Sequence, residues 1–214
     1  MEVKDFENRR WSEKFQKMEF RHRVAPGLIS GNTVLDVGCG DGLLMKELAR
    51  AGKQVEGIDL SGVAVERCRK EGLKATEGDF ASGPLPFAEK QFETVVALDV
   101  LEHVYEPERL LKEMVRVSSD AVVISVPNFS SLPARLQVLF GKVPENNRPN
   151  KGHVYWFNWP VLQSHLKNNG LYISAMEVNA PWERIPVVGL LTGWCARLLP
   201  NLCALSFVIQ CKKI

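Results

Sequence analysis

The sequence predicts an α/β fold in which helices cover both faces of a mostly parallel sheet. Short apolar runs alternate with segments of helical periodicity along most of the chain. One run, FETVVAL at 92–98, is apolar almost throughout, as expected for a strand buried in the centre of a sheet. A glycine-rich turn at 38–42 joins the first predicted strand to the first predicted helix, and this connection places a ligand-binding turn at the end of a strand.

Composition and charge narrow the class of protein. The 214 residues are 45% hydrophobic and 24% charged, which fits one globular domain spanning 1–214. The formal net charge of +2 is small and the basic residues are spread along the chain, so no nucleic-acid partner is expected. The N-terminus has no apolar core of the signal-peptide kind, and the five cysteines contain no C-x-x-C pair. We therefore expect a cytoplasmic protein without a metal site or a disulfide framework.

The turn Gly38-Cys39-Gly40-Asp41-Gly42 restricts the ligand. A dinucleotide fingerprint has the pattern G-x-G-x-x-G/A, but here Leu43 stands three positions after Gly40. A phosphate-binding P-loop needs Gly-Lys-Ser/Thr, whereas this loop carries an acid that would repel a pyrophosphate. The turn thus favours a ligand without phosphate, and the alternative is a turn that only connects strand and helix.

The segment Asp36-Val37-Gly38-Cys39-Gly40-Asp41-Gly42 resembles the first motif of the class I S-adenosylmethionine (SAM) dependent methyltransferases. SAM carries a sulfonium and an amino group, so acids near its binding loop are electrostatically reasonable. The resemblance implies SAM as cofactor, S-adenosylhomocysteine (SAH) as product, and cofactor contacts from Asp36, Gly38, Cys39 and Gly40. It also implies a Rossmann-like sheet of seven strands, mostly parallel, with an antiparallel last strand.

The elements before the third strand can be taken in order. Aromatic residues at helical intervals predict an amphipathic covering helix at about 2–23, broken by Pro26-Gly27. The second strand, 54–59, ends in Asp59, which lies 23 positions after Asp36. An acid at this place can accept hydrogen bonds from both ribose hydroxyls, and Leu60 beside it is a further predicted cofactor contact. The alternative for Asp59 is an ordinary turn residue.

Two later strand ends continue the resemblance. Asp79-Phe80 resembles the motif that meets adenine, which implies that Asp79 accepts a hydrogen bond from the adenine amino group while Phe80 lines one face of the ring. Gly-Asp pairs are also common in plain turns. The strand 92–98 ends at Leu98, which is a further predicted cofactor contact. The segment that follows, Asp99-Val100-Leu101-Glu102-His103, is similar to type 11 methyltransferases, where it borders the methionine end of SAM.

A helix at 106–117 and a strand at 121–126, stopped by Pro127, complete the parallel part. Type 11 enzymes usually carry a Lys-Pro-Gly-Gly turn before that strand, but this chain has Ser118-Ser119-Asp120. That turn and the segment Val126-Pro127-Asn128-Phe129 resemble MetW-type methyltransferases. The segment 98–103, in contrast, is unlike the MetW-type group. The resemblance therefore implies the superfamily and no particular substrate.

The remaining chain supplies a cover and two strands. A lid-like insertion is expected at about 128–158, followed by a helix that Asn158 caps. Strands at 171–178 and 204–211 are, by resemblance, an antiparallel pair. Between them, the apolar part of the insertion 181–201 is too short to cross a bilayer. We favour packing against the core for it over contact of 185–201 with a membrane surface or a second copy, and the oligomeric state stays open.

The predicted function is transfer of a methyl group from SAM to a small-molecule acceptor. A hydroxyl or amine acceptor must lose a proton, and His103 and His153 are the candidate bases, with a structural or capping role as the alternative. A non-catalytic SAM-binding partner or regulatory protein is the other class considered. A nucleic-acid methyltransferase is not favoured, because the Asn/Asp-Pro-Pro-Tyr/Phe tetrad is absent after the fourth strand.

Overall fold

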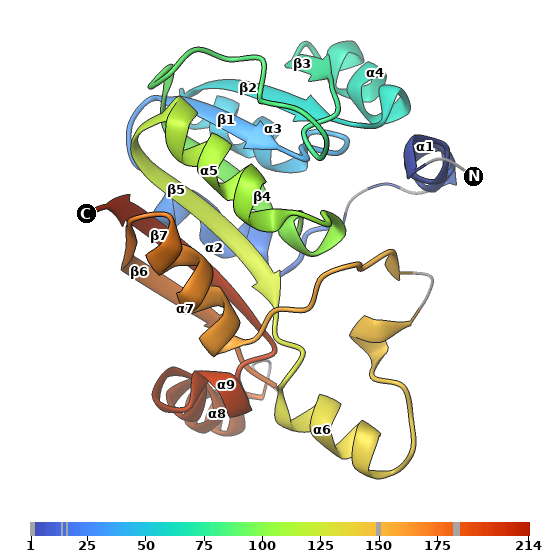
Figure 1. The fold of residues 1–214 in the computed structure, drawn as a ribbon, viewed down its shortest axis with the longest axis vertical. Coiled ribbons are helices and arrows are strands. Elements are labelled where there is room, and N and C mark those ends of the chain that lie inside the picture. Colours follow the sequence, from blue (N-terminus) through green and yellow to red (C-terminus); the bar gives the residue numbers. More distant parts are fainter. Residues whose placement is uncertain (1–2, 14, 16, 149–150, 182–184) are drawn as a thin grey trace.

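Five parallel strands and one antiparallel pair form a seven-stranded sheet in the order β3-β2-β1-β4-β5-β7-β6 (Figure 1). The computed structural model describes residues 3–13, 15, 17–148, 151–181 and 185–214. The strands are β1 (Thr33–Val37), β2 (Gln54–Asp59), β3 (Lys74–Glu77), β4 (Phe92–Leu98), β5 (Ser118–Pro127), β6 (Leu171–Asn179) and β7 (Ser206–Lys213). β7 runs antiparallel to both β5 and β6. The predicted fold class is confirmed.

Helices cover both faces of this sheet. On one face lie α5 (Pro107–Val117) and α7 (Trp159–Asn168), and on the other lie α2 (Phe20–Leu28) and α3 (Leu43–Arg50), with α4 (Gly62–Lys70) beside α3 at the β3 edge. Alternate residues of one strand serve opposite faces: Val95 packs toward α5 and α7, and Val96 toward α2 and α3. The continuous apolar pattern of β4 follows from this burial on both sides.

Side-chain caps and strand pairing set the ends of several elements. Ser61 Oγ accepts a hydrogen bond from the Ala64 N–H at the start of α4. At the start of α7, Asn158 Oδ1 accepts one from the Val161 N–H, as predicted. The predicted turn at 118–120 is wrong. β5 begins at Ser118, directly after α5, because Ser118 already pairs with Phe92 of β4.

The N-terminal region differs from the single helix predicted at 2–23. It forms two helices, α1 (Val3–Glu13) and α2, and α2 continues through Pro26 and Gly27 to Leu28. Glu19 begins α2 through a reciprocal pair of hydrogen bonds with His22. Pro26 has no N–H, so α2 lacks the backbone hydrogen bond that this position would otherwise donate to the His22 carbonyl. Residues 2, 14 and 16 of the predicted helix lie outside the described residues.

The predicted lid region holds α6 (Leu132–Leu139) and the short 3₁₀ turn η2 (Glu145–Asn147), and residues 149–150 lie outside the description. The 3₁₀ turn η1 (Leu101–His103) follows β4.

Segment 185–203 forms α8 (Pro186–Leu198) and α9 (Pro200–Cys203). Among the described residues, no helix is long and apolar enough to cross a bilayer.

The core-packing interpretation of 181–201 is wrong for α8. Its large apolar side chains stand in solvent, with Leu190 76% exposed and Trp194 66% exposed, while Ala196 is buried. Apolar residues lie on all sides of α8. When one side packs on β6, the side that faces water is therefore apolar as well. Residues 182–184 of this insertion lie outside the described part of the chain.

Candidate functional site

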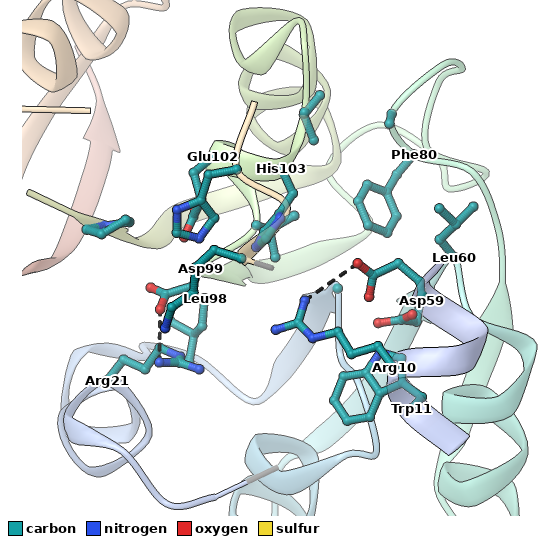
Figure 2. Close-up of a pocket in the computed structure, with 18 of the residues that line it drawn as sticks. Arg10, Trp11, Arg21, Asp59, Leu60, Phe80, Leu98, Asp99, Glu102 and His103 are labelled. Atoms are coloured by element: carbon teal, nitrogen blue, oxygen red, sulfur yellow. Dashed lines mark ion pairs between the residues drawn. The ribbon is translucent and has the colours of Figure 1, made fainter. Parts of the chain in front are cut away.

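The cleft lies where the strand order reverses, between the carboxyl ends of β1 and β4. Its volume is about 270 Å³, close to the lower end of the roughly 300–1,000 Å³ that is usual for small-molecule sites. Figure 2 shows Asp59, Leu60 and Phe80 at one end of the cleft, and Asp99, Arg21 and Glu102 toward the other. Of the predicted site residues, those that line it are Gly38, Asp59, Leu60, Phe80, Leu98, His103 and His153.

Gly38 brings the backbone of the first loop against the cleft. Its φ is +72°, a conformation that costs an L-residue energy. A Cβ built there would lie 2.5 Å from Cγ2 of Val100, which also lines the cleft. Glycine is therefore required here for two separate reasons.

The other predicted loop residues lie behind the lining. Gly40 donates its N–H to Asp59 Oδ2 at 2.8 Å, and the Ser61 N–H donates to Asp59 Oδ1 at 2.8 Å. Cys39 is buried. Its hydrogen-bonding contact with Cys68 is the main reason, and burial the second, why the pKa of its thiol is raised well above the usual value. Neither Cys39 nor Gly40 is part of the cleft wall, so both support Asp59 or the loop.

Two buried carboxyl groups sit under this end. Burial raises the pKa of Asp59 to about 6, against the lowering effect of its two backbone donors. Burial and the nearby Asp59 raise the pKa of Asp36 to about 8. Asp36 is 3% exposed and does not line the cleft. Asp36 lies near the end of β1, directly before the glycine-rich loop, so it can affect a ligand by supporting that loop. Its direct contact with the cofactor stays a prediction.

The adenine-side pair separates in the structure. Phe80 lines the cleft, whereas Asp79 is exposed and its Oδ1 accepts hydrogen bonds from the Ala81 and Ser82 N–H groups of its own loop. The Asp79 carboxylate thus stabilises the loop that carries Phe80. Its predicted bond to an adenine amino group stays a prediction.

Asp99, directly after β4, holds a polar corner of the cleft. Its φ of +54° is unusual for a residue with a side chain, and such backbone strain often marks functional positions. Ser125 of β5 fixes the position: its Oγ donates to Asp99 Oδ1 and accepts from the Asp99 N–H at 2.9 Å. Arg21 of α2 pairs with Asp99 Oδ2 at 2.9 Å.

Glu102, His103 and His153 form a cluster in the wall beside that corner. The His103 Nδ1 lies 3.0 Å from the Gly152 carbonyl and the His153 Nδ1 lies 2.8 Å from the Asn146 carbonyl. Burial lowers the pKa of both imidazoles, that of His103 to about 4, so both are neutral at pH 7. Burial, reinforced by Asp99, raises the pKa of Glu102 well above its usual value. The structure thus brings the two predicted histidines together, with ring centroids 4.8 Å apart.

Helix α1 supplies part of the site that sequence reasoning missed. Glu7, Arg10 and Trp11 line the cleft, and Figure 2 shows Arg10 and Trp11 beside Asp59. The Asn8 Oδ1 accepts a hydrogen bond from Ser61 Oγ at 2.8 Å, which ties α1 to the start of α4. Aromatic spacing predicted a covering helix, but the polar side chains that face the ligand end carry no periodic pattern of their own. Arg21 and Lys151 also line the cleft without a sequence signal, whereas Asp99 and Glu102 stand in the segment predicted to border the methionine end of SAM.

A family model described as "Methionine biosynthesis protein MetW" matches residues 20–173. A ubiquinone biosynthesis O-methyltransferase from Methylococcus capsulatus is 32% identical over 119 residues, which are 53% of this chain and 50% of that protein. One of the same name from Azoarcus sp. is 30% identical over 163 residues, covering 70% of this chain and 68% of the relative. The chain spans half or less of the length of the first curated relatives that it matches.

Solved structures share the fold at lower identity. The crystal structure of magnesium protoporphyrin IX methyltransferase from Synechocystis PCC 6803 with bound SAH superposes with a TM-score of 0.68 at 20% identity, covering 99% of this chain and 98% of that one. At this identity the likeness concerns the fold.

Proposed function

The chain belongs to the MetW family of class I SAM-dependent methyltransferases, and from that premise we propose that it transfers the methyl group of SAM to a small-molecule acceptor. The observation that carries the proposal is the buried Asp59 carboxylate in the cleft, held by two backbone N–H groups at the switch point of the sheet. The names of the relatives support an oxygen atom as the methyl acceptor, and the name of the family model points to methionine biosynthesis.

The residues present fit SAM as the group held in the cleft. Gly38 brings loop backbone to the cleft wall at a point where a Cβ would clash with Val100. Phe80 offers an aromatic face for a flat heterocycle, and Asp59 offers carboxylate oxygens for ribose hydroxyls. Asp59 and Asp99 set negative charge along a ligand that carries positive charge. When bound, SAM would supply a methyl group on a positive sulfur, which makes that carbon a strong electrophile.

The chain's own contribution is to orient the acceptor and to exclude water, which can contribute roughly 7–11 kcal/mol to such a reaction. The acceptor end of the cleft is the corner formed by Asp99, His103 and His153. Since both imidazoles are neutral and each Nδ1 meets a carbonyl, each Nε2 keeps a lone pair. His103, with a pKa of about 4, is a weak base at pH 7, so its lone pair is better suited to binding than to taking a proton.

Isothermal titration of the full chain with SAM and SAH tests the proposal. We expect micromolar binding that Asp59→Ala weakens at least tenfold, or about 1.4 kcal/mol. The matched control is Asp120→Ala. Asp120 lies near the start of β5, at the end of the strand away from the cleft, and pairs with Lys212 at 3.0 Å. Failure of the wild type to bind either ligand would overturn the proposal.

A second titration outcome separates the two function classes. Tight SAH binding without methyl transfer to any acceptor tried would favour the non-catalytic SAM-binding partner.

The cytoplasmic location and the lack of a nucleic-acid partner stay predictions from the sequence.

A further inference from the structure

Three side chains with metal-binding atoms meet in the wall of the cleft. One ligand atom each from Glu102, His103 and His153 can be chosen so that all lie within 4.8 Å of one another. The His153 Nε2 is 4.0 Å from Glu102 Oε1. Glu102 and His103 come from η1, whereas His153 comes from the end of the lid region, so the tertiary fold assembles the cluster.

Glu102 is the unusual member. Its side chain is 1% exposed, and neither carboxylate oxygen accepts a hydrogen bond from any other residue that the structure describes. A buried carboxylate without a partner is costly, and such groups are normally paired or bound to a cation. One of these oxygens lies within 4.8 Å of a ring nitrogen of each imidazole.

The histidines are already oriented as ligands. Each Nδ1 is within hydrogen-bond distance of a backbone carbonyl, of Gly152 for His103 and of Asn146 for His153. Metal-binding histidines usually donate their second ring N–H in this way, which fixes the tautomer and the ring orientation. The Nε2 atoms therefore remain available for a cation.

We propose that Glu102, His103 and His153 bind a divalent first-row transition ion of the zinc class. Two imidazoles and one carboxylate suit such ions, whereas Mg²⁺ and Ca²⁺ prefer oxygen ligands alone. Tetrahedral zinc with bonds near 2.0–2.2 Å keeps its ligand atoms roughly 3.3–3.5 Å apart. The ligand atoms lie within 4.8 Å of one another, so the widest pair would have to contract by up to roughly 1.5 Å, a movement within the reach of side-chain rotation.

Three protein ligands leave a fourth position open, and all three residues line the cleft. A bound cation would offer that position to an oxygen atom of the acceptor. This consequence rests on the proposed function, whereas the binding of the metal does not.

The test uses the full chain, freed of metal with a chelator and titrated with Zn²⁺ by calorimetry and with Co²⁺ by visible absorption. We expect one equivalent to bind with a submicromolar Kd. Glu102→Gln and His153→Ala should each weaken binding at least about 100-fold, because loss of a hydrogen bond that only orients a metal ligand already costs about 10–100-fold. The control is His165→Ala, since His165 also lies near a glutamate, 3.6 Å from Glu108, but outside the cluster. Its affinity should match that of the wild type within about twofold.

Three results would overturn the proposal: no stoichiometric binding to the wild type, binding that persists in both cluster variants, or Co²⁺ spectra with the charge-transfer bands of thiolate ligands. Circular dichroism checks that the variants fold. If a variant does not fold, the Tm of the wild type and of His165→Ala is measured with and without Zn²⁺. The proposal expects Zn²⁺ to raise both Tm values, and no rise in the wild type counts against the site. None of these readouts depends on SAM binding, so failure here and failure of the proposed function are distinguishable.

Discussion

At the scale of single residues, Asp59 gives a pH dependence whose sign can be worked out. Burial raises the pKa of Asp59 to about 6. Ribose hydroxyls would donate to the ionised carboxylate, so below pH 6 binding must first remove a proton. Affinity for SAH should therefore rise with pH from about 5 to 7, by up to about tenfold per unit at the acid end, and then level off. Calorimetry across this range measures it.

The control for this profile is Asp59→Asn, which cannot ionise and should bind weakly with an affinity that is flat between pH 5 and 7. Asp36 has a pKa of about 8, so its ionisation falls above this range. An unchanged slope in Asp59→Asn would assign the proton to another group. The same shift has a consequence for stability: the free energy of unfolding should fall as pH rises from about 4 to 6, because the folded state keeps the proton longer than the unfolded chain does.

Gly38 allows strain and steric clash to be separated. Gly38→Ala combines a positive φ with a contact of 2.5 Å to Val100, whereas Gly52→Ala has a φ of +82° and nothing within 4 Å of the new Cβ. Backbone strain should cost each variant about 1–2 kcal/mol. Overpacking should cost Gly38→Ala roughly 1–3 kcal/mol more. Urea unfolding of the two variants measures the difference, and equal losses would contradict the clash.

The sequence predicted the residues whose role depends on backbone position. Gly38 and Asp59 stand at strand ends, and their places follow from the order of strands and helices. It did not predict Arg10 or Arg21, because neither a periodic pattern nor a motif connects them with the cleft. Asp79 shows the opposite case: a motif indicated a ligand contact, and the structure places the carboxylate on its own loop.

At the scale of elements, Asn128 joins the end of β5 to the chain around α9. It is fully buried, and its Nδ2 lies 2.8 Å from the Ala204 carbonyl and 3.1 Å from that of Asn201, while its Oδ1 accepts from the Ser130 N–H at 3.0 Å. Asn128→Ala would leave buried carbonyls without donors and should cost about 2–4 kcal/mol of unfolding free energy.

The comparison for Asn128 is Asn158→Ala, at the other end of the lid region. Asn158 caps α7, so its loss should cost only about 1 kcal/mol. Urea unfolding of both variants ranks them. The reverse order would mean that the Asn128 contacts do not hold β5 to α9.

Elements with a strong internal pattern were predictable. The strand 92–98 has the same bounds in the structure, and the predicted cap at Asn158 is present. The N-terminal region was predicted less well, because the break between α1 and α2 is set by the capping at Glu19 and by the docking of Asn8 on Ser61. Such contacts depend on residues far apart in sequence.

At the scale of the whole molecule, the approach of His153 to His103 and the exposure of α8 were not predicted, both for one reason. His153 lies 50 positions after His103 and no spacing rule joins them, so the sequence predicted no metal. For α8, apolar composition suggested burial, but composition cannot tell which side of a helix faces a partner. In both cases the deciding fact is how distant segments pack.

The exposure of α8 predicts an unusual pattern of stability. Leu190→Gln and Trp194→Gln replace side chains that are 76% and 66% exposed, so each should change the free energy of unfolding by less than about 0.5 kcal/mol. Ala196→Gln, at a fully buried position of the same helix, should cost roughly 1–3 kcal/mol through overpacking. Thermal and urea unfolding of the three variants measure this.

A cost above about 1.5 kcal/mol for Leu190→Gln would match the burial of a large apolar side chain and would restore the core-packing interpretation. The expected small cost means that these side chains do not stabilise the fold of this chain. Of the interpretations that the sequence allowed for 185–201, contact with a membrane surface and contact with a second copy would then remain. Sedimentation of the wild type and of Leu190→Gln would separate them, because only self-association depends on protein concentration without lipid.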